Sequence, residues 1–347
     1  MIIWENTDMK SIILHQVGNK LQNEGVKLSK EPLSVNPVIR DLLLRYFIAP
    51  FKSEEYHNLS HDSDIELNEV YSFVSRIFND PTTLYEHSIS LARHLYERSN
   101  HPKIKRGEFY TVYFKGCKLN GESVDAVGLF KSENKDTFLK VYPSGQGFEI
   151  ESQQGVNINK LDKGCIIFNT EKEKGYLVSV VDNTNKGADA QFWINDFLRI
   201  SPRKDDYHDT QLILSLCNDF LTRELPEQVE LSRAEQAGML NESMRFFKER
   251  GNFNLDEFAQ DVMGSPELID RFNNYRKEFQ EKNEIELQPE FNISEAAVKK
   301  EQKHFRSVIK LDHNFHIYIH GNHKYIRKGY DEESGLNYYQ LFFKDEL

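Results

Sequence analysis

The sequence predicts an α+β protein: an N-terminal domain with helices packed on an antiparallel β-meander, then a C-terminal helical region closed by a small antiparallel sheet. Apolar residues repeat at helical spacing up to residue 98, the period changes to two from Gly107, and capped helices precede short strands near the C-terminus. A chain of 347 residues exceeds the roughly 250–300 that one core serves. We therefore expect two domains, residues 1–205 and 206–347.

The composition is that of a globular protein with an acidic balance. Hydrophobic residues make up 39% of the chain, and 55 acidic residues against 44 basic ones give a net charge of −11. An anionic surface repels phosphate, so only segregated basic patches could bind nucleic acid. No apolar run approaches the ~20 residues of a membrane span, and the first residues lack the features of a secretion signal. The prediction is a cytoplasmic protein.

The cysteines exclude two kinds of stabilising site. Cys117, Cys165 and Cys217 are an odd number at wide spacing, and the sequence has no Cys-x-x-Cys pair. This pattern indicates neither a disulfide framework nor a zinc knuckle. We expect reduced, partly buried thiols.

The chain begins with a predicted strand and a predicted helix. Residues 9–20 have the apolar density of a strand, which ends near Gly18. Asn36 suits a helix N-cap and Pro37 the first helical position, because proline has no N–H to leave unpaired there. Pro50 ends this helix.

Two further helices follow before the first long strand. Residues 67–80 carry apolar side chains on one face of a helix. The next helix follows Pro81, and Thr83 with Glu86 matches a capping box. Both helices are amphipathic, so we expect them to pack on the sheet that follows.

From Gly107 onward, short segments of alternating hydrophobicity predict an antiparallel meander. The strand-like segments are residues 108–117, 123–131, 136–143, 163–170 and 175–183. The turns at Asn120-Gly121 and Lys174-Gly175 join neighbouring strands without a crossover. A parallel nucleotide-binding sheet is therefore not expected.

The C-terminal part is predicted to be helical and to end in strands. An aromatic-rich connection, residues 189–210, leads into it, and the domain boundary is expected near Asp205. Its helices are marked by caps at Asp209, at Ser232 with Glu235, at Asn254 with Glu257, at Ser265 before Pro266, and at Ser294. Residues 307–312, 315–321, 324–331 and 337–343 then predict the small closing sheet.

Three basic groups stand out from the acidic balance. The connector of residues 98–107 contains no carboxylate, and local potential governs where a polyanion docks. The candidate nucleic-acid-binding residues are Lys103, Lys105 and Arg106 in the connector, Arg199, Arg203 and Lys204 in the second group, and Lys299, Lys300, Lys303 and Arg306 in the third. Lys299, Lys303 and Arg306 would form one stripe on a helix. The alternative is that all three groups are ordinary solvated surface.

Enzymatic interpretations lack assembled parts. The sequence contains no glycine-rich nucleotide loop, phosphate loop, Gly-x-Ser-x-Gly elbow or His-Glu-x-x-His motif. Clusters that could mimic a metal or acid/base site are His313, His316, His320 and His323; His57, His61 and Asp62; and Asp205 with Asp206. We interpret the first as solvent-facing strand residues, the second as a surface loop and the third as an ion-paired loop. No catalytic residue, metal or cofactor is predicted.

Several segments, taken together, resemble the bacterial nucleoid-associated proteins of the NdpA/YejK type. They are ILHQVGNK, YFIAPF, LNEVYSFVSRIFND, SISLARHLYERSNHPKIKRGEFYTVYF, FWINDFLRISPRKDDYHDT, KLDHNFHIYIHGN and YYQLFFKDE. The resemblance covers nearly the whole chain. It implies a cytoplasmic, nucleoid-associated, non-enzymatic homodimer that binds double-stranded DNA, and it supplies no catalytic residues.

Two function classes remain open from the sequence. The first is a protein that binds DNA directly and with little sequence specificity through the three basic groups. The second is an adaptor that reaches the nucleoid through a DNA-handling protein partner, without touching DNA. A nucleic-acid hydrolase is a third and weaker hypothesis, which divalent-dependent cleavage of DNA would support.

Overall fold

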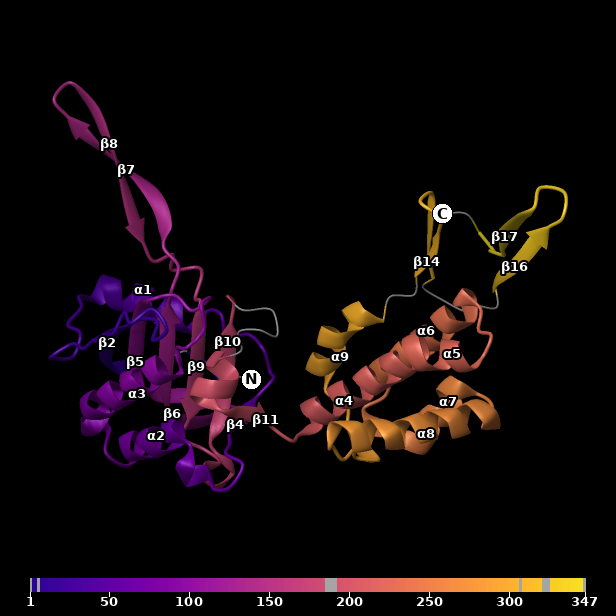
Figure 1. Ribbon diagram of the computed structural model, residues 1–347, viewed down its shortest axis with the longest axis horizontal. Coiled ribbons are helices and arrows are strands. Elements are labelled where there is room, and N and C mark those ends of the chain that lie inside the picture. Colours follow the sequence, from indigo (N-terminus) through magenta and orange to yellow (C-terminus); the bar gives the residue numbers. More distant parts are fainter. Residues whose placement is uncertain (1, 5–6, 185–191, 306–307, 320–324, 346–347) are drawn as a thin grey trace. The chain divides into compact units, whose positions relative to one another are not determined.

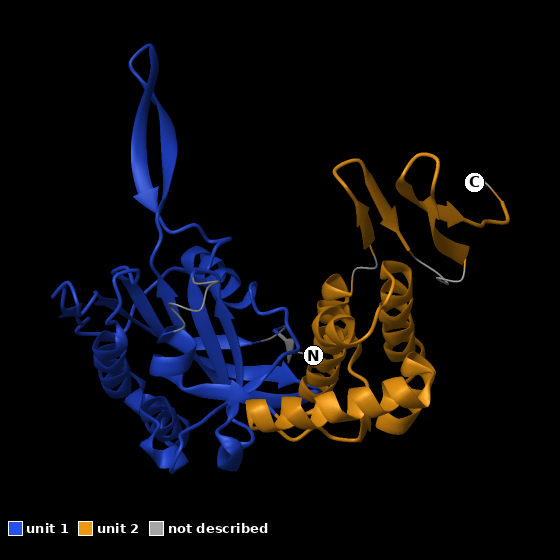
Figure 2. Ribbon diagram, turned by 45° about the vertical axis from the view of Figure 1, so that its right-hand side comes forward, with its two compact units in different colours: residues 1–203 blue, residues 204–347 orange. Residues whose placement is uncertain are grey.

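The computed structural model describes the chain except for residues 1, 5–6, 185–191, 306–307, 320–324 and 346–347 (Figure 1). The chain forms two compact units, residues 1–203 and residues 204–347 (Figure 2). Each unit has hydrophobic cores of its own. Helices and antiparallel strand pairs occur in both, which confirms the α+β class.

Unit 1 is built on a nine-stranded sheet in which all strand pairs are antiparallel. Its order is β11-β4-β10-β9-β6-β5-β2-β3, with β1 paired to β5. The strands are β1 (Ile2–Ile3), β2 (Asp8–Val17), β3 (Val26–Lys27), β4 (His57–Leu59), β5 (Gly107–Leu119), β6 (Glu122–Ser132), β9 (Lys163–Phe168), β10 (Leu177–Asp182) and β11 (Ile200–Pro202). The prediction of an antiparallel sheet is confirmed.

Both faces of this sheet are covered by helices. Helices α2 (Glu69–Asn79) and α3 (Leu84–Arg98) pack on one face, and α1 (Pro37–Ile48) packs on the other (Figure 1). On the α1 face, the rings of Phe47 and Phe130 stack with centroids 4.3 Å apart. Because the central strands are buried on both faces, β9 is buried along its whole length and is apolar except for Lys163 at its start.

Two N-caps are predicted in unit 1, at Asn36 and at Thr83, and the structure confirms the first of them. Asn36 caps α1 by accepting the backbone N–H of Ile39 at 2.9 Å, and Pro37 occupies the first turn, as predicted. The capping box at Thr83 is wrong, since the Thr83 side chain makes no cap bond. Its hydroxyl instead donates to the carbonyl of Asp80 within a preceding 3-10 turn, η2 (Pro81–Thr83).

The segment predicted as the third strand of the meander leaves the sheet. Strand β6 pairs directly with β9, and the intervening chain forms a separate hairpin of β7 (Asp136–Ser144) and β8 (Gly147–Gly155). Strand β8 was not predicted, because its sequence GFEIESQQG shows little apolar density. This hairpin projects from the body of unit 1 (Figure 1).

Unit 2 contains the predicted helical region. Its helices are α4 (Asp206–Asp219), α5 (Leu225–Gln228), α6 (Arg233–Glu249), α7 (Leu255–Met263), α8 (Pro266–Asn283) and α9 (Glu295–Glu301), with a π-helical segment η6 (Phe220–Glu224) between α4 and α5. They enclose an aromatic core in which Phe258 and Phe220 both contact Phe272.

The caps of unit 2 were read correctly at four of five positions. Ser232 and Glu235 form a reciprocal capping box, and Asn254, Ser265 and Ser294 each accept a backbone N–H. The cap at Asp209 is wrong. Helix α4 begins one turn earlier, because the Asp205 carboxylate accepts the backbone N–H of His208 at 3.1 Å.

The predicted single closing sheet is, in the described part of unit 2, several two-stranded sheets. Strand β12 (Asn252–Asn254) pairs with β13 (Glu290–Asn292), β14 (Val308–Leu311) with β15 (Phe315–Tyr318), and β16 (Ile326–Asp331) with β17 (Leu336–Leu341). Ile309 and Ile319 pack on Ala234 and Ala237 of α6. Phe315 of β15 is 66% exposed.

The three cysteines are free and buried, as predicted for reduced thiols. Burial raises the pKa of Cys117 to about 11 and that of Cys217 to about 12, and it also raises the pKa of Cys165. The thiolate is the reactive form, so these side chains are chemically quiet near neutral pH.

Gly175 provides a test of the sheet edge. It precedes β10 with a φ of +95°, and a Cβ added there would lie 1.9 Å from the carbonyl oxygen of Leu59 in β4. Gly121 has a similar φ of +90° with open space around it. Gly175→Ala should lower the free energy of unfolding by about 3 kcal/mol, and Gly121→Ala by about 1 kcal/mol. Urea unfolding measures both losses, and equal losses would contradict the crowding at Leu59.

Candidate nucleic-acid interface

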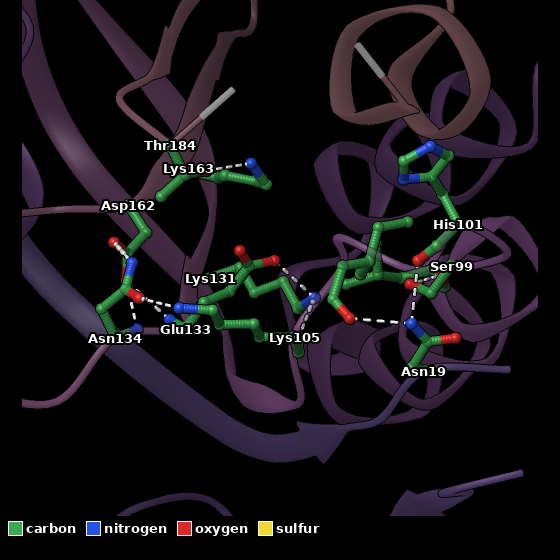
Figure 3. Close-up of polar contacts among 12 residues, drawn as sticks. Asn19, Ser99, His101, Lys105, Lys131, Glu133, Asn134, Asp162, Lys163 and Thr184 are labelled. Carbon is green, nitrogen blue, oxygen red and sulfur yellow. Dashed lines mark hydrogen bonds and ion pairs between the residues drawn. The ribbon is translucent and has the colours of Figure 1, made fainter. Parts of the chain in front are cut away.

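The backbone of the basic connector (residues 98–107) is held by hydrogen bonds from the buried side chain of Asn19. This side chain is fully buried at the end of β2, and its Nδ2 donates to the carbonyl oxygens of His101 at 2.9 Å and Ile104 at 2.8 Å (Figure 3). The backbone N–H of Lys20 also donates to the carbonyl of Ser99 at 2.8 Å. The connector backbone is therefore fixed at three carbonyls.

A buried lysine holds the other end of the connector. Lys131 of β6 is fully buried, and its Nζ donates to the carbonyl of Lys105 at 2.9 Å and to Glu133 Oε1 at 2.7 Å (Figure 3). Burial lowers the pKa of Lys131, and the Glu133 carboxylate opposes that shift. A buried amine without these partners would be costly, so the ion pair and the connector carbonyl depend on each other.

The turn after Glu133 is fixed by Asp162, which in turn positions a cation of the connector. Asp162 Oδ2 accepts the backbone N–H groups of Glu133 at 2.6 Å and Asn134 at 2.8 Å, and its Oδ1 accepts Asn134 Nδ2 at 2.7 Å. Asn134 Oδ1 then accepts Lys105 Nζ at 2.7 Å. This partner of Lys105 is a neutral amide, so the contact leaves the charge of Lys105 uncompensated.

A second buried lysine lies beside the first. Lys163 of β9 is the register partner of Lys131, and its Nζ contacts the Asp182 carboxylate at 2.9 Å. Both amines lie over the ring of Phe192, 5.5 Å from its centroid for Lys131 and 5.3 Å for Lys163. Carboxylates and an aromatic face thus compensate both buried charges. Sequence analysis missed these residues because an isolated lysine in a strand carries no sign of burial.

The predicted connector cations are at the surface. Lys103, Lys105 and Arg106 are exposed, while Ile104 between them is buried. The buried Ile104 and the fixed carbonyls of the connector define where the side chains leave the surface. The connector therefore presents cations from an ordered backbone and not from a loose loop.

The second basic group is largely engaged with carboxylates. Arg203 binds Glu171 through two hydrogen bonds, of 3.1 Å from Nε and 2.6 Å from the terminal nitrogen. Arg199 lies 3.8 Å from Glu69, and Arg98 contacts the same carboxylate at 3.1 Å. Arg199 of the second group and Arg98 at the start of the connector therefore share Glu69, which neutralises part of their charge.

Lys204 opens unit 2 and lines a cavity of about 700 Å³. The other lining residues are mostly polar or acidic: His208, Asp209, Leu212, Gln280, Glu281, Glu284, Ile285, Glu286 and Gln288. Burial, reinforced by neighbouring Asp206 and Asp205, raises the pKa of Asp209. The surroundings of Lys204 are therefore unfavourable for phosphate.

The described part of the third basic group is divided between a helix and the turn that follows it. Helix α9 ends at Glu301, and Lys303 lies in a following 3-10 turn, η7 (Gln302–His304). Lys299 and Lys303 are exposed, and Lys300 lies 5.9 Å from the centroid of the Tyr207 ring. Arg306 lies outside the described residues. Lys299 and Lys303 therefore do not lie on one α-helix, and the stripe that includes Arg306 stays a prediction.

The clusters that could mimic catalytic sites have structural roles. His61 Nδ1 accepts the backbone N–H of Ser63 at 3.2 Å, and His57 lies in β4. Asp205 caps α4, and Asp206 accepts a hydrogen bond from the side chain of Asn292. Among the described residues, no three His, Cys, Asp or Glu side chains converge as metal ligands. His320 and His323 lie outside the described residues.

A buried His–Ser pair also lacks the arrangement of a nucleophile and its base. His15 Nε2 lies 3.0 Å from Ser88 Oγ, but His15 Nδ1 accepts the backbone N–H of Ser29 at 3.1 Å. The Nε2 atom therefore carries the proton and donates to Ser88, whose hydroxyl donates to the carbonyl of Tyr85 at 2.7 Å. The pair ties β2 to α3 and cannot deprotonate the serine.

The chain thus combines an antiparallel α+β unit that carries an ordered basic connector with a helical unit that follows it in sequence. The family model NA37, described as nucleoid-associated protein YejK, matches residues 13–335. The chain therefore belongs to the nucleoid-associated protein YejK family, which is not an enzyme family. No protein with a curated description matches the chain. Among the described residues, no helix is both long and apolar enough to cross a membrane.

Removing the Asn19 side chain should release the connector. Asn19→Ala leaves the carbonyls of His101 and Ile104 without their donor, so unfolding should become easier by about 2 kcal/mol. Hydrogen exchange of the connector amides should also accelerate. Asn159→Ala, at an exposed asparagine of the same unit, should change neither quantity. Unchanged connector exchange in Asn19→Ala would show that Asn19 does not hold it.

Burial of His15 makes stability depend on pH. Desolvation lowers the pKa of His15 to about 4, whereas the unfolded chain protonates at about 6.5. The unfolded state thus binds the proton first, and the stabilisation present above pH 6.5 is lost as the pH falls towards 4. Between pH 7 and pH 5 the wild-type protein should lose about 2 kcal/mol more than His15→Gln. Urea unfolding at both values measures this, and parallel losses would refute it.

Proposed function

We propose that this protein binds double-stranded DNA directly, non-enzymatically and with little sequence specificity, acting as a homodimer at the cytoplasmic nucleoid. The observation that supports it most is the basic connector, whose cations Lys103, Lys105 and Arg106 are exposed while its backbone is pinned by Asn19 and Lys131. An ordered backbone reduces the entropy lost when cations dock on phosphates. Family membership supports association with the nucleoid.

Weak sequence specificity is expected because the exposed side chains are lysines and arginines, which contact phosphates. Lysine and arginine at a surface connector contact phosphate oxygens, which position a protein on a duplex but carry no base information. In the second unit, Lys299 and Lys303 offer the same chemistry. Each patch alone is small, so joining patches from two units or two copies would raise the apparent affinity.

The acidic balance of the chain sets the expected strength of binding. With a net charge of −11, and with Arg199 and Arg203 engaged by Glu69 and Glu171, few cations are available for phosphate. A few phosphate contacts supply little affinity, and added salt lowers that affinity further. We therefore expect retention on DNA at low salt and weak binding at physiological salt.

Fluorescence anisotropy of a labelled duplex over a salt series tests this function. Each phosphate contact contributes about 0.9 to the slope of log affinity against log salt. Lys105→Ala with Arg106→Ala should therefore lower the slope by about 2. Lys299→Ala with Lys303→Ala should lower it likewise if unit 2 takes part.

Matched double variants control for the loss of charge. Lys115→Ala with Lys118→Ala removes two exposed cations from the opposite end of β5, and Lys277→Ala with Lys282→Ala removes two from α8. Both should leave the slope almost unchanged. If wild-type protein ignores DNA at moderate salt yet retrieves a DNA-handling enzyme, the adaptor function replaces direct binding.

A further inference from the structure

The β7–β8 hairpin has one apolar face that nothing covers in the described chain. Paired residues of an antiparallel hairpin share a face, so Val141 with Ile150 and Pro143 with Phe148 point the same way as Leu139. All five are exposed, with exposed fractions of 76% for Phe148, 67% for Leu139, 64% for Ile150 and 58% for Val141. An isolated two-stranded hairpin is marginally stable in water, so this face calls for a partner.

On the opposite face of the hairpin, the polar side chains contact one another. Tyr142 Oη lies 2.7 Å from Glu151 and 3.1 Å from Glu149, and Lys140 lies 5.7 Å from the centroid of the Tyr142 ring. Lys140 and Glu151 are also directly paired across the strands, where opposite charges attract. The hairpin is thus amphipathic: one face is mostly polar and also carries Phe138, which is 49% exposed, and the other face is apolar and open.

The charge of the hairpin argues against DNA as its partner. Residues 136–155 contain three carboxylates, Asp136, Glu149 and Glu151, and a single cation, Lys140. A net charge of −2 on a thin hairpin would be repelled by phosphates on either side of a groove. The apolar face carries no charge at all, which suits an apolar protein surface.

A second uncovered apolar surface lies on helix α1 of the same unit. Val38, Ile39 and Leu42 are 68%, 42% and 37% exposed, although Tyr46 and Phe47 of the same helix are buried against the sheet. This stripe has the apolar chemistry that fits the hairpin face. A chain that carries both surfaces can satisfy both by pairing with its own copy.

We propose that the hairpin is a dimerisation arm, whose apolar face packs on the Val38, Ile39 and Leu42 stripe of a second copy, and reciprocally. Strands of 9 residues make a face about 30 Å long and about 10 Å wide. Two arms facing each other would bury only about 600 Å² in total, below the size of specific interfaces. Reciprocal exchange makes two arm-to-helix contacts in place of one arm-to-arm contact, so it can bury up to twice that area, about 1,200 Å². This inference rests on the homodimer in the proposed function and not on DNA binding.

Sedimentation velocity of the full chain without DNA, over a dilution series, tests the arm. Wild type should sediment as a dimer, and Val141→Glu with Ile150→Glu should weaken dimerisation by roughly a hundredfold, because two carboxylates would be buried unpaired. Gln153→Glu, on the polar face of the same hairpin, should change it by less than about twofold. Circular dichroism should show all three proteins folded, since these side chains contact no core. A monomeric wild type, or an unchanged dimer in the double variant, would overturn the proposal.

Disulfide trapping identifies the surface that the arm meets. A mixture of Val141→Cys protein with Ile39→Cys protein should form an intermolecular disulfide on mild oxidation, while the native cysteines are buried and stay reduced. Cross-linking of Val141→Cys only with itself would mean arm-on-arm packing and would reject the α1 site. If the double glutamate variant stays dimeric but loses DNA affinity, the arm contacts DNA and the proposal fails. If the wild-type protein is a dimer but does not bind DNA, only the proposed DNA-binding function is contradicted.

Discussion

The basic connector, which is the best ordered part of the candidate interface, depends on buried polar groups that bind its backbone. Asn19 and Lys131 lie inside unit 1 and donate to carbonyls of His101, Ile104 and Lys105. A buried amide or amine without partners would destabilise the fold by several kcal/mol. The connector supplies those partners, so folding of the core and ordering of the basic surface are coupled.

Ion pairs and hydrogen bonds, and not the numbers of acidic and basic residues, decide which charges of this protein are compensated. Acidic residues outnumber basic ones, yet the carboxylates that surround the connector are occupied: Glu133 binds Lys131, and Asp162 binds backbone N–H groups. Elsewhere, Glu69 and Glu171 take up arginines that the sequence offers as phosphate ligands. Net charge therefore predicts neither which cations are available nor where they lie.

The period of the apolar residues and the helix N-caps predicted much of the fold. The period change at Gly107, the N-cap at Asn36 and the capping box at Ser232 all correspond to observed features. The capping rule failed before α3, where two residues could each cap a turn. The Asp80 side chain caps the 3-10 turn η2, and Thr83 makes no cap bond to α3. Local rules also failed where pairing is non-local, since nothing in residues 136–143 shows that β6 prefers β9 as its neighbour.

The sequence by itself determined the α+β class, the positions of most helices and which segments are rich in lysine and arginine, because these follow from side-chain period and composition. Only the tertiary structure decided which cations are paired, that Lys131 is buried, and that the β7–β8 hairpin leaves the sheet with an apolar face uncovered. Ion pairs such as Arg98 with Glu69 and anchors such as Asn19 with Ile104 join residues that are distant along the chain. A one-dimensional pattern carries no record of such contacts, which arise only when the cores close.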